Sequence, residues 1–187
     1  MIIHVKFNKM SLGEKPVEVK ENKSQFICNK GIELLNYRIN EEEFTSRLYK
    51  SMAIWFKSKS YNGFAKFWKD WADEELVHAS WACHYLLDLD IKPDVRPLKE
   101  VKNVYESVED VIRTTLEAEI EVTNQCKELA SFAKEKEDFM LLNLAMKYLK
   151  EQQEEINKIT NILAKVNSFG KSEIVLLELD EQFLENE

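Results

Sequence analysis

Four stretches of the sequence repeat residues at alternating spacings of three and four, and each repeat carries a polar residue near its centre. Such spacing places the repeating residues on one face of a helix. We expect helices at about residues 31–56, 64–89, 104–133 and 142–166, with a short fifth helix at 174–184. The 187-residue chain contains only four Gly and three Pro, which suits long helices. The chain is therefore predicted to be all-α.

The polar interruptions occupy matched positions. They are Glu42, Glu75 with His78, Glu119 and Gln152. The first pair of helices and the second pair show the same separation (75 − 42 = 33 and 152 − 119 = 33), so folding each pair at its turn brings its two interruptions together. The second pair also follows the first by a constant offset (119 − 42 = 77 and 152 − 75 = 77). This indicates a duplicated helical hairpin, in which Gln152-x-x-Glu155 matches Glu75-x-x-His78.

The connections between the predicted helices favour one topology. "KSKSYNG" and "KEKED" are short turns, whereas "DIKPDVRPLKEVKN" is long for neighbouring antiparallel helices. Two hairpins joined by a long crossover predict a four-helix bundle with up-down-down-up order. Residues 1–29 differ, since "IIHVKF" alternates like a short strand and a polar, loop-like stretch follows. We expect 1–29 to be an N-terminal extension and 30–187 to be the bundle domain.

Charge and composition exclude several classes of protein. The net charge of −8 argues against nucleic acid as a partner. No apolar run approaches the roughly 20 residues of a membrane span, and the N-terminus lacks a signal-peptide layout, so we expect a cytoplasmic protein. The odd number and wide spacing of Cys28, Cys83 and Cys126 disfavour a disulfide framework or a zinc knuckle. We expect buried free thiols.

The predicted bundle brings several carboxylates into its interior. An unpaired buried carboxylate costs several kcal/mol or becomes protonated, and a bound cation would compensate for three of them. Oxygen ligands with one imidazole favour iron or manganese over thiolate-bound zinc. Glutamates and Glu-x-x-His motifs on facing helices are typical of di-iron carboxylate bundles. We predict a first metal position at Glu42, Glu75 and His78, and a weaker second one at Glu75 and Glu119 with Gln152 nearby.

Further residues around these positions have two interpretations each. Four acids beside the central positions would hold a third metal, or would simply form a solvated charged face. They are Glu74, Glu151, Glu154 and Glu155. Tyr49 lies on the same predicted face as Glu42, where it would hydrogen-bond a ligand or give up an electron; the alternative is a core tyrosine with a satisfied hydroxyl.

Four motifs together resemble the non-haem bacterial ferritins. They are "NEEEFTSRLYKSMAIWF" (residues 40–56), "GFAKFWKDWADEELVHA" (63–79), "EAEIEVTNQCKELA" (117–130) and "YLKEQQEEI" (148–156). The resemblance covers residues 31 to about 184 and implies a ferritin-like four-helix bundle with a short fifth helix. It implies oxidation of Fe(II) by oxygen or hydrogen peroxide and storage of the ferric mineral in a shell of 24 identical subunits.

The same resemblance implies roles for individual residues. The first iron would bind Glu42, Glu75 and His78, and the second Glu75, Glu119 and Gln152, with Tyr49 alongside. A third iron would bind the acids Glu74, Glu151, Glu154 and Glu155. Haem is not expected, because the second half lacks the Glu-x-x-His of bacterioferritins. Two alternatives use the same chain: a di-iron oxidase or peroxidase that stores no iron, and a structural bundle without metal, which would have to explain four coincident polar interruptions.

Overall fold

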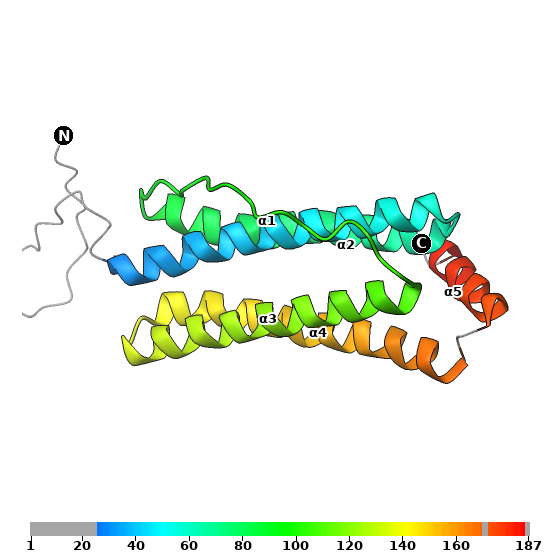
Figure 1. Cartoon of the computed structure of the whole chain (residues 1–187). Coiled ribbons are helices and arrows are strands. Elements are labelled where there is room, and N and C mark those ends of the chain that lie inside the picture. The colour runs from blue at the N-terminus through cyan, green and yellow to red at the C-terminus, as the bar shows by residue number, and fades with distance from the viewer. Residues whose placement is uncertain (1–25, 170–171, 186–187) are drawn as a thin grey trace, which may run out of the picture.

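The computed structural model describes residues 26–169 and 172–185, and it is built from helices. Four long helices are followed by a short fifth helix. They are α1 Asn29–Ser58, α2 Asn62–Asp88, α3 Val108–Glu135, α4 Phe139–Phe169 and α5 Glu173–Glu185. Figure 1 shows α1 and α2 as one antiparallel pair, α3 and α4 as another, and a crossover that runs the length of the bundle between them. The predicted up-down-down-up bundle with a short fifth helix is confirmed.

The crossover, residues 89–107, is fastened along α1. The backbone N–H of Asp94 donates to the side-chain oxygen of Asn36 at 2.8 Å, and the hydroxyl of Ser51 donates to the carbonyl of Lys102 at 2.5 Å. The third helix begins about four residues later than the sequence pattern predicted. Ser107 is extended and its side chain accepts a hydrogen bond from the N–H of Asp110 at 3.1 Å, so this N-cap fixes the start.

The short helix α5 packs across one end of the bundle, against α2 (Figure 1). Asp180 accepts a hydrogen bond from the N–H of Phe64 at 2.8 Å. The ring of Phe183 lies 5.1 Å from that of Phe64 and 4.6 Å from that of Phe67, measured between centroids. Helix α5 approaches α2 so closely that a Cβ atom on Gly63 would lie 1.7 Å from the carbonyl oxygen of Asp180. Glycine is therefore required at residue 63.

The two hairpins turn in the same way. After α1, Ser60 has a φ of 66°, and the N–H of Tyr61 donates to the carbonyl of Phe56 at 3.1 Å. After α3, Glu137 has a φ of 54°, and the N–H of Asp138 donates to the carbonyl of Ala133 at 2.9 Å. Both are left-handed helix ends of the Schellman type. The equivalent residues differ by the offset read from the sequence (137 − 60 = 77), which strengthens the interpretation as a duplicated hairpin.

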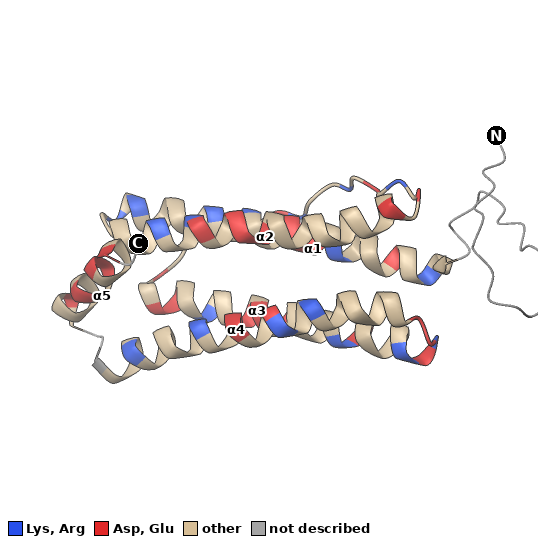
Figure 2. Ribbon diagram, turned by 180° about the vertical axis from the view of Figure 1, so that it is seen from behind, with Lys and Arg blue, Asp and Glu red and all other residues tan. Residues whose placement is uncertain are grey.

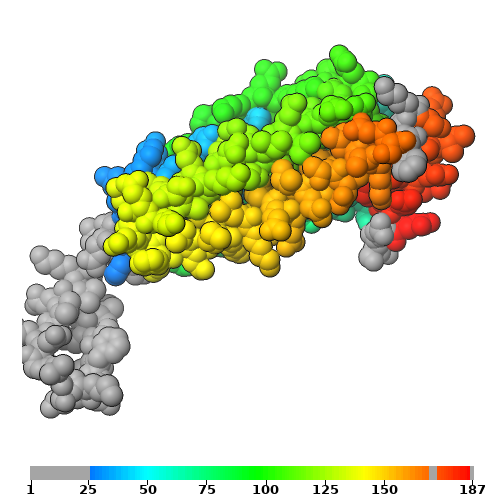
Figure 3. Space-filling view, turned by 90° about the horizontal axis from the view of Figure 1, so that it is seen from below, coloured from blue at the N-terminus to red at the C-terminus, as the bar shows by residue number. Residues whose placement is uncertain are grey.

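The buried apolar residues form two clusters, one toward each end of the bundle. The cluster at the α5 end contains many aromatic rings, among them Phe56, Phe64 and Trp68. The cluster at the other end is largely aliphatic and includes Leu35 and Leu129. The buried polar interruptions lie between these clusters along each helix. Seen from the side that α3 and α4 cover, the bundle is an elongated rod (Figure 3).

The sequence also made predictions about membrane-spanning helices, the cysteines and an N-terminal strand. None of the described helices is long and apolar enough to cross a membrane. The cysteines are free thiols, but Cys28 is exposed just before α1, so the prediction of buried thiols is wrong for this residue; Cys126 is buried and Cys83 lies between. The strand predicted at "IIHVKF" lies outside the described residues.

Candidate metal centre

The α1–α2 hairpin contributes Glu42, Glu75 and His78, all of which are buried. The nitrogen Nδ1 of His78 lies 3.2 Å from Oε2 of Glu75. One potential ligand atom from each of the three residues lies within 4.8 Å of the others. Two oxygens, Oε2 of Glu42 and Oε1 of Glu75, are buried without a hydrogen-bond partner. Buried carboxylate oxygens without partners are costly, and a cation is the partner that suits them.

The α3–α4 hairpin contributes Glu119, Gln152 and Glu155, which are also buried and are bound to one another. The amide nitrogen of Gln152 donates to Oε2 of Glu119 at 3.1 Å and also to Oε2 of Glu155. Its amide oxygen accepts from the hydroxyl of Thr123 at 2.9 Å. The hydroxyl of Tyr49 donates to the other oxygen of Glu119. This half of the centre is thus closed by hydrogen bonds where the first half has free oxygens.

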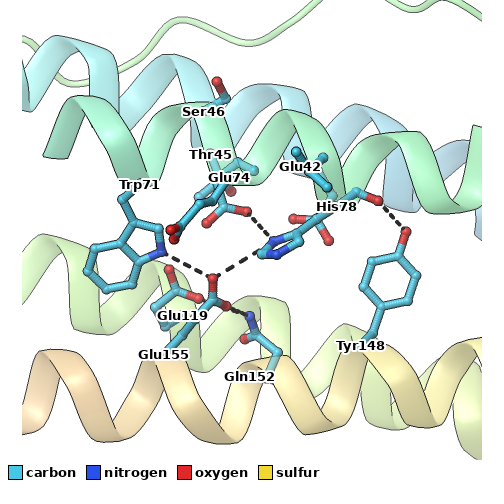
Figure 4. A network of polar contacts seen from close by, with 12 residues as sticks. Glu42, Thr45, Ser46, Trp71, Glu74, His78, Glu119, Tyr148, Gln152 and Glu155 are labelled. Carbon is cyan, nitrogen blue, oxygen red and sulfur yellow. Dashed lines mark hydrogen bonds and ion pairs between the residues drawn. The ribbon is translucent and has the colours of Figure 1, made fainter. Parts of the chain in front are cut away.

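The two halves face each other across the middle of the bundle (Figure 4). Ligand atoms of Glu75, Glu119 and Glu155 lie within 4.8 Å of one another, so carboxylates of three different helices converge. His78 connects the halves, since its Nδ1 lies 3.8 Å from Oε1 of Glu155. Glu155 was predicted only for the third position, and its burial places it with the central carboxylates as well.

Two aromatic residues that the sequence interpretation missed support the central groups. The indole N–H of Trp71 donates to Oε1 of Glu155 at 3.1 Å, and the hydroxyl of Tyr148 donates to the backbone carbonyl of His78 at 2.7 Å. These two contacts are equivalent under the hairpin duplication, because 148 − 71 = 77 and 155 − 78 = 77. Applying the offset to the aromatic residues one or two turns from each interruption would have identified this pair.

Burial sets the protonation of the residues at the centre. Burial, with neighbouring carboxylates as the second cause, raises the pKa of Glu75 well above its ordinary value. Burial raises the pKa of Glu119 to about 7, although hydrogen bonds from Tyr49 and Gln152 lower it. Burial and the charge of Glu119 raise the pKa of Glu155 to about 9. Burial lowers the pKa of His78. The centre therefore holds protons at neutral pH that a cation would displace.

The four acids predicted for a third metal lie on the α2 and α4 faces, where acidic residues gather at mid-length (Figure 2). Glu151 and Glu155 bring ligand atoms within 4.8 Å of His78. Glu74 is exposed and forms an ion pair with Lys158 at 3.4 Å, and Glu154 is exposed. Among the described residues, groups with ligand atoms this close to one another include neither Glu74 nor Glu154.

A bundle of this topology with carboxylates and one histidine at its centre defines a protein of the ferritin-like class. Residues 32–169 match the family model of the ferritin-like domain, and the chain belongs to the ferritin family. It is 31% identical over 140 residues to a probable bacterial non-heme ferritin-like protein of Haemophilus influenzae, covering 75% of this chain and 85% of the relative. It is 30% identical to a bacterial non-heme ferritin of Escherichia coli, covering 81% of this chain and 92% of the relative.

A solved structure is similar along nearly its whole length. The open pore ferritin of the hyperthermophilic archaeon Archaeoglobus fulgidus superimposes with a TM-score of 0.84 at 28% sequence identity, covering 87% of this chain and 99% of that one. This similarity agrees with the family match.

Proposed function

We propose that the protein is a cytoplasmic iron-storage protein that oxidises Fe(II) at an intrasubunit di-iron centre and stores the product as a ferric mineral. The observation that carries the proposal is the convergence of buried carboxylates and one imidazole midway along a ferritin-family bundle, with unpartnered oxygens on Glu42 and Glu75. Membership of the ferritin family and similarity to bacterial non-heme ferritins support it.

The proposed ligands follow the geometry of the two halves. The first Fe(II) binds Glu42, Glu75 and His78, and the second binds Glu75, Glu119 and Glu155 with Gln152 beside it. Glu75 is shared because its ligand atoms belong to both groups. A third iron binds near Glu151 and Glu155, with Glu74 and Glu154 as more distant partners on the same face. No haem is part of this proposal.

The chain's own groups prepare the oxidation. Binding of the second Fe(II) displaces protons from Glu119 and Glu155 and breaks their hydrogen bonds to Gln152, whose side chain then turns to the metal or to water. Each Fe(II) gives one electron to dioxygen, so two Fe(II), one O₂ and two protons give two Fe(III) and one H₂O₂. Tyr49 donates its hydrogen bond to Glu119 and so orients that ligand. Hydrogen peroxide would serve as the alternative oxidant, taking two electrons to form water.

Storage requires assembly. We propose a homo-oligomeric shell of 24 subunits, supported by the similarity to a ferritin whose structure is described as open pore. Iron loading separates this proposal from a di-iron oxidase that stores nothing. A shell would retain far more iron than its di-iron centres hold, whereas an oxidase would retain only the iron of those centres. Native mass measurement of the full chain reports the assembly directly.

The test adds Fe(II) to the metal-free protein in air and follows the ferric absorbance. Wild-type protein should oxidise Fe(II) much faster than buffer, and Glu75→Ala should return the rate to that of buffer because both proposed positions lose a ligand. Glu128→Ala, an exposed glutamate on α3, is the matched control and should retain the wild-type rate. Wild-type protein no faster than buffer would refute the proposal, as would a Glu75→Ala rate equal to wild type.

A further inference from the structure

Arg38 is a buried arginine next to the proposed first iron position. Only 1% of the residue is exposed, and its Nη2 lies 2.6 Å from Oε1 of Glu42. Its Nη1 donates to the side-chain oxygen of Gln125, and its guanidinium carbon lies 5.7 Å from the ring centroid of Tyr148. Burial alone would lower the pKa of Arg38, but the Glu42 carboxylate raises it, so the side chain keeps its charge. A buried charge of this kind is costly even when it is paired.

The ion pair with Arg38 occupies one of the two carboxylate oxygens of Glu42. Oε1 faces Arg38, and Oε2 is buried with no hydrogen-bond partner. Glu42 therefore offers a single free oxygen to the group that it forms with Glu75 and His78. A carboxylate held in this way cannot bind a metal through both oxygens unless it gives up Arg38.

The other half of the centre has no equivalent cation. The residue related to Arg38 by the hairpin offset is Thr115 (38 + 77 = 115). Its hydroxyl donates to the carbonyl of Val111 at 3.0 Å and lies 3.3 Å from the sulfur of Met52. A fixed positive charge has thus been placed beside Glu42 and not beside the equivalent Glu119.

We propose that Arg38 is a positioning residue that keeps Glu42 a one-oxygen ligand and makes the first position hold a trivalent ion less tightly than it otherwise would. This rests on the proposed function, since it assumes that Fe(II) binds there and leaves as Fe(III). Repulsion between Arg38 and a bound metal grows with the charge of the metal, and burial strengthens it. The arginine therefore opposes the oxidised product more than the reduced substrate, and it favours release of Fe(III) toward storage.

The test measures the affinity of redox-inert ions for the full-length, metal-free protein. Zn²⁺ binding is followed by calorimetry, and Tb³⁺ binding by luminescence sensitised by the nearby tryptophans. Arg38→Gln should tighten binding of Tb³⁺ about tenfold more than binding of Zn²⁺, because the change removes charge repulsion. Arg38→Lys keeps the charge and should keep the wild-type ratio of the two affinities. Arg113→Gln removes an exposed arginine that also pairs with a glutamate on its own helix, and it should leave both affinities unchanged.

A second variant keeps the test decisive if Arg38→Gln does not fold. Gln125→Glu retains the acceptor of the Arg38 hydrogen bond and adds a negative charge to it, so it should shift the Tb³⁺ to Zn²⁺ ratio in the same direction by about threefold. An unchanged ratio in the folded variants, or an equal loss of both affinities, would overturn the assignment and leave Arg38 a structural residue. Wild-type protein that binds neither ion would instead overturn the proposed function.

Discussion

The two hairpins of the bundle share a backbone plan and differ in the polar groups at their centres. Their turns, and the aromatic contacts of Trp71 and Tyr148, are equivalent under a single offset. Yet the α1–α2 half leaves oxygens of Glu42 and Glu75 without partners, whereas the α3–α4 half joins its polar groups by hydrogen bonds through Gln152. The two hairpins therefore share one frame and differ in the polar groups that it holds.

This difference predicts an order of binding. A cation entering the first half meets free oxygens, which it satisfies without breaking a hydrogen bond at those atoms. A cation entering the second half has to replace the hydrogen bonds around Glu119 and displace protons from Glu119 and Glu155, whose pKa values are both raised, whereas among the carboxylates of the first half the pKa of Glu75 is the raised one. Affinity should thus be higher in the first half and should depend more steeply on pH in the second.

Among the changes that separate the two halves, the largest expected effect comes from removing His78, the nitrogen ligand proposed for the first position. His78→Ala should abolish the tight metal site and slow Fe(II) oxidation by more than the roughly 10–100-fold that loss of an outer-shell partner costs. Gln152→Ala, at a neutral group of the second half, should slow oxidation by about tenfold or less and leave the tight site intact. Stopped-flow oxidation and calorimetric Zn²⁺ binding measure the two effects. Equal losses in both variants would contradict the asymmetry.

The second prediction concerns pH and the metal-free protein. The pKa values of Glu119 and Glu155 rise from an ordinary value of 4.5 to about 7 and about 9 on folding. The folded state thus binds more protons at these groups than the unfolded state does. Their stabilising contribution is complete below pH 4.5 and is lost as the pH rises through about 7 and then about 9. The melting temperature of metal-free protein should therefore fall between pH 7 and 9.

Two variants of the same experiment separate the causes. Glu155→Gln should flatten the upper part of this fall, because the group that titrates near pH 9 is gone. Saturating Zn²⁺ should raise the melting temperature by an amount that grows with pH, since the metal takes the place of the lost protons. The lowered pKa of His78 acts in the opposite direction at lower pH, so the window above pH 7 isolates the carboxylates. Calorimetry across pH 7 to 9 that showed no fall would contradict the assignment.

The third prediction compares two buried tyrosine hydroxyls. Tyr49 donates to the carboxylate of Glu119, whereas Tyr148 donates to the carbonyl of His78. Hydrogen bonds to charged groups are worth more than those between neutral groups. Tyr49→Phe should therefore lower the free energy of unfolding by about 1.5–3 kcal/mol at pH 9, and Tyr148→Phe by about 0.5–1.5 kcal/mol. Urea titration at pH 9 measures both, and a larger loss for Tyr148→Phe would be the wrong sign.

Much of the fold and the centre was predictable because the two hairpins repeat the same spacing in the sequence. The helical period, the long crossover and the matched interruptions follow from spacing alone, and Glu42, Glu75, His78 and Glu119 converge where that spacing predicts. Spacing could not predict the contacts that depend on side-chain direction. The rotation of α4 about its axis relative to α2 decides which side chains meet. It determines the burial of Glu155, the hydrogen bond from the indole N–H of Trp71 to Glu155, and the ion pair of Glu74 with Lys158.

The burial of Arg38 could not be predicted from spacing either. An arginine within a predicted helix is expected at the surface, because arginine is almost never fully buried unless it is paired. Its spacing of four from Glu42 is also typical of exposed helical ion pairs. Only the packing of α1 against α3, which brings Gln125 to its guanidinium, reveals that this pair is buried.

The smallest expected effect tests whether the two turns are as equivalent as they look. Ser60 and Glu137 both adopt positive φ, and this backbone strain costs a residue with a Cβ about 1–2 kcal/mol. Glycine avoids the strain, but it raises the conformational entropy of the unfolded chain, which lowers stability by about 0.4–1 kcal/mol. Ser60→Gly and Glu137→Gly should therefore each stabilise the protein by about 0.5–1 kcal/mol, and their effects should add because the sites are independent. Lys50→Gly, at an exposed position inside α1, should instead destabilise it by about 1 kcal/mol. Thermal unfolding of the three variants and the double variant measures this, and a gain in one hairpin alone would mean that the matched turns carry unequal strain.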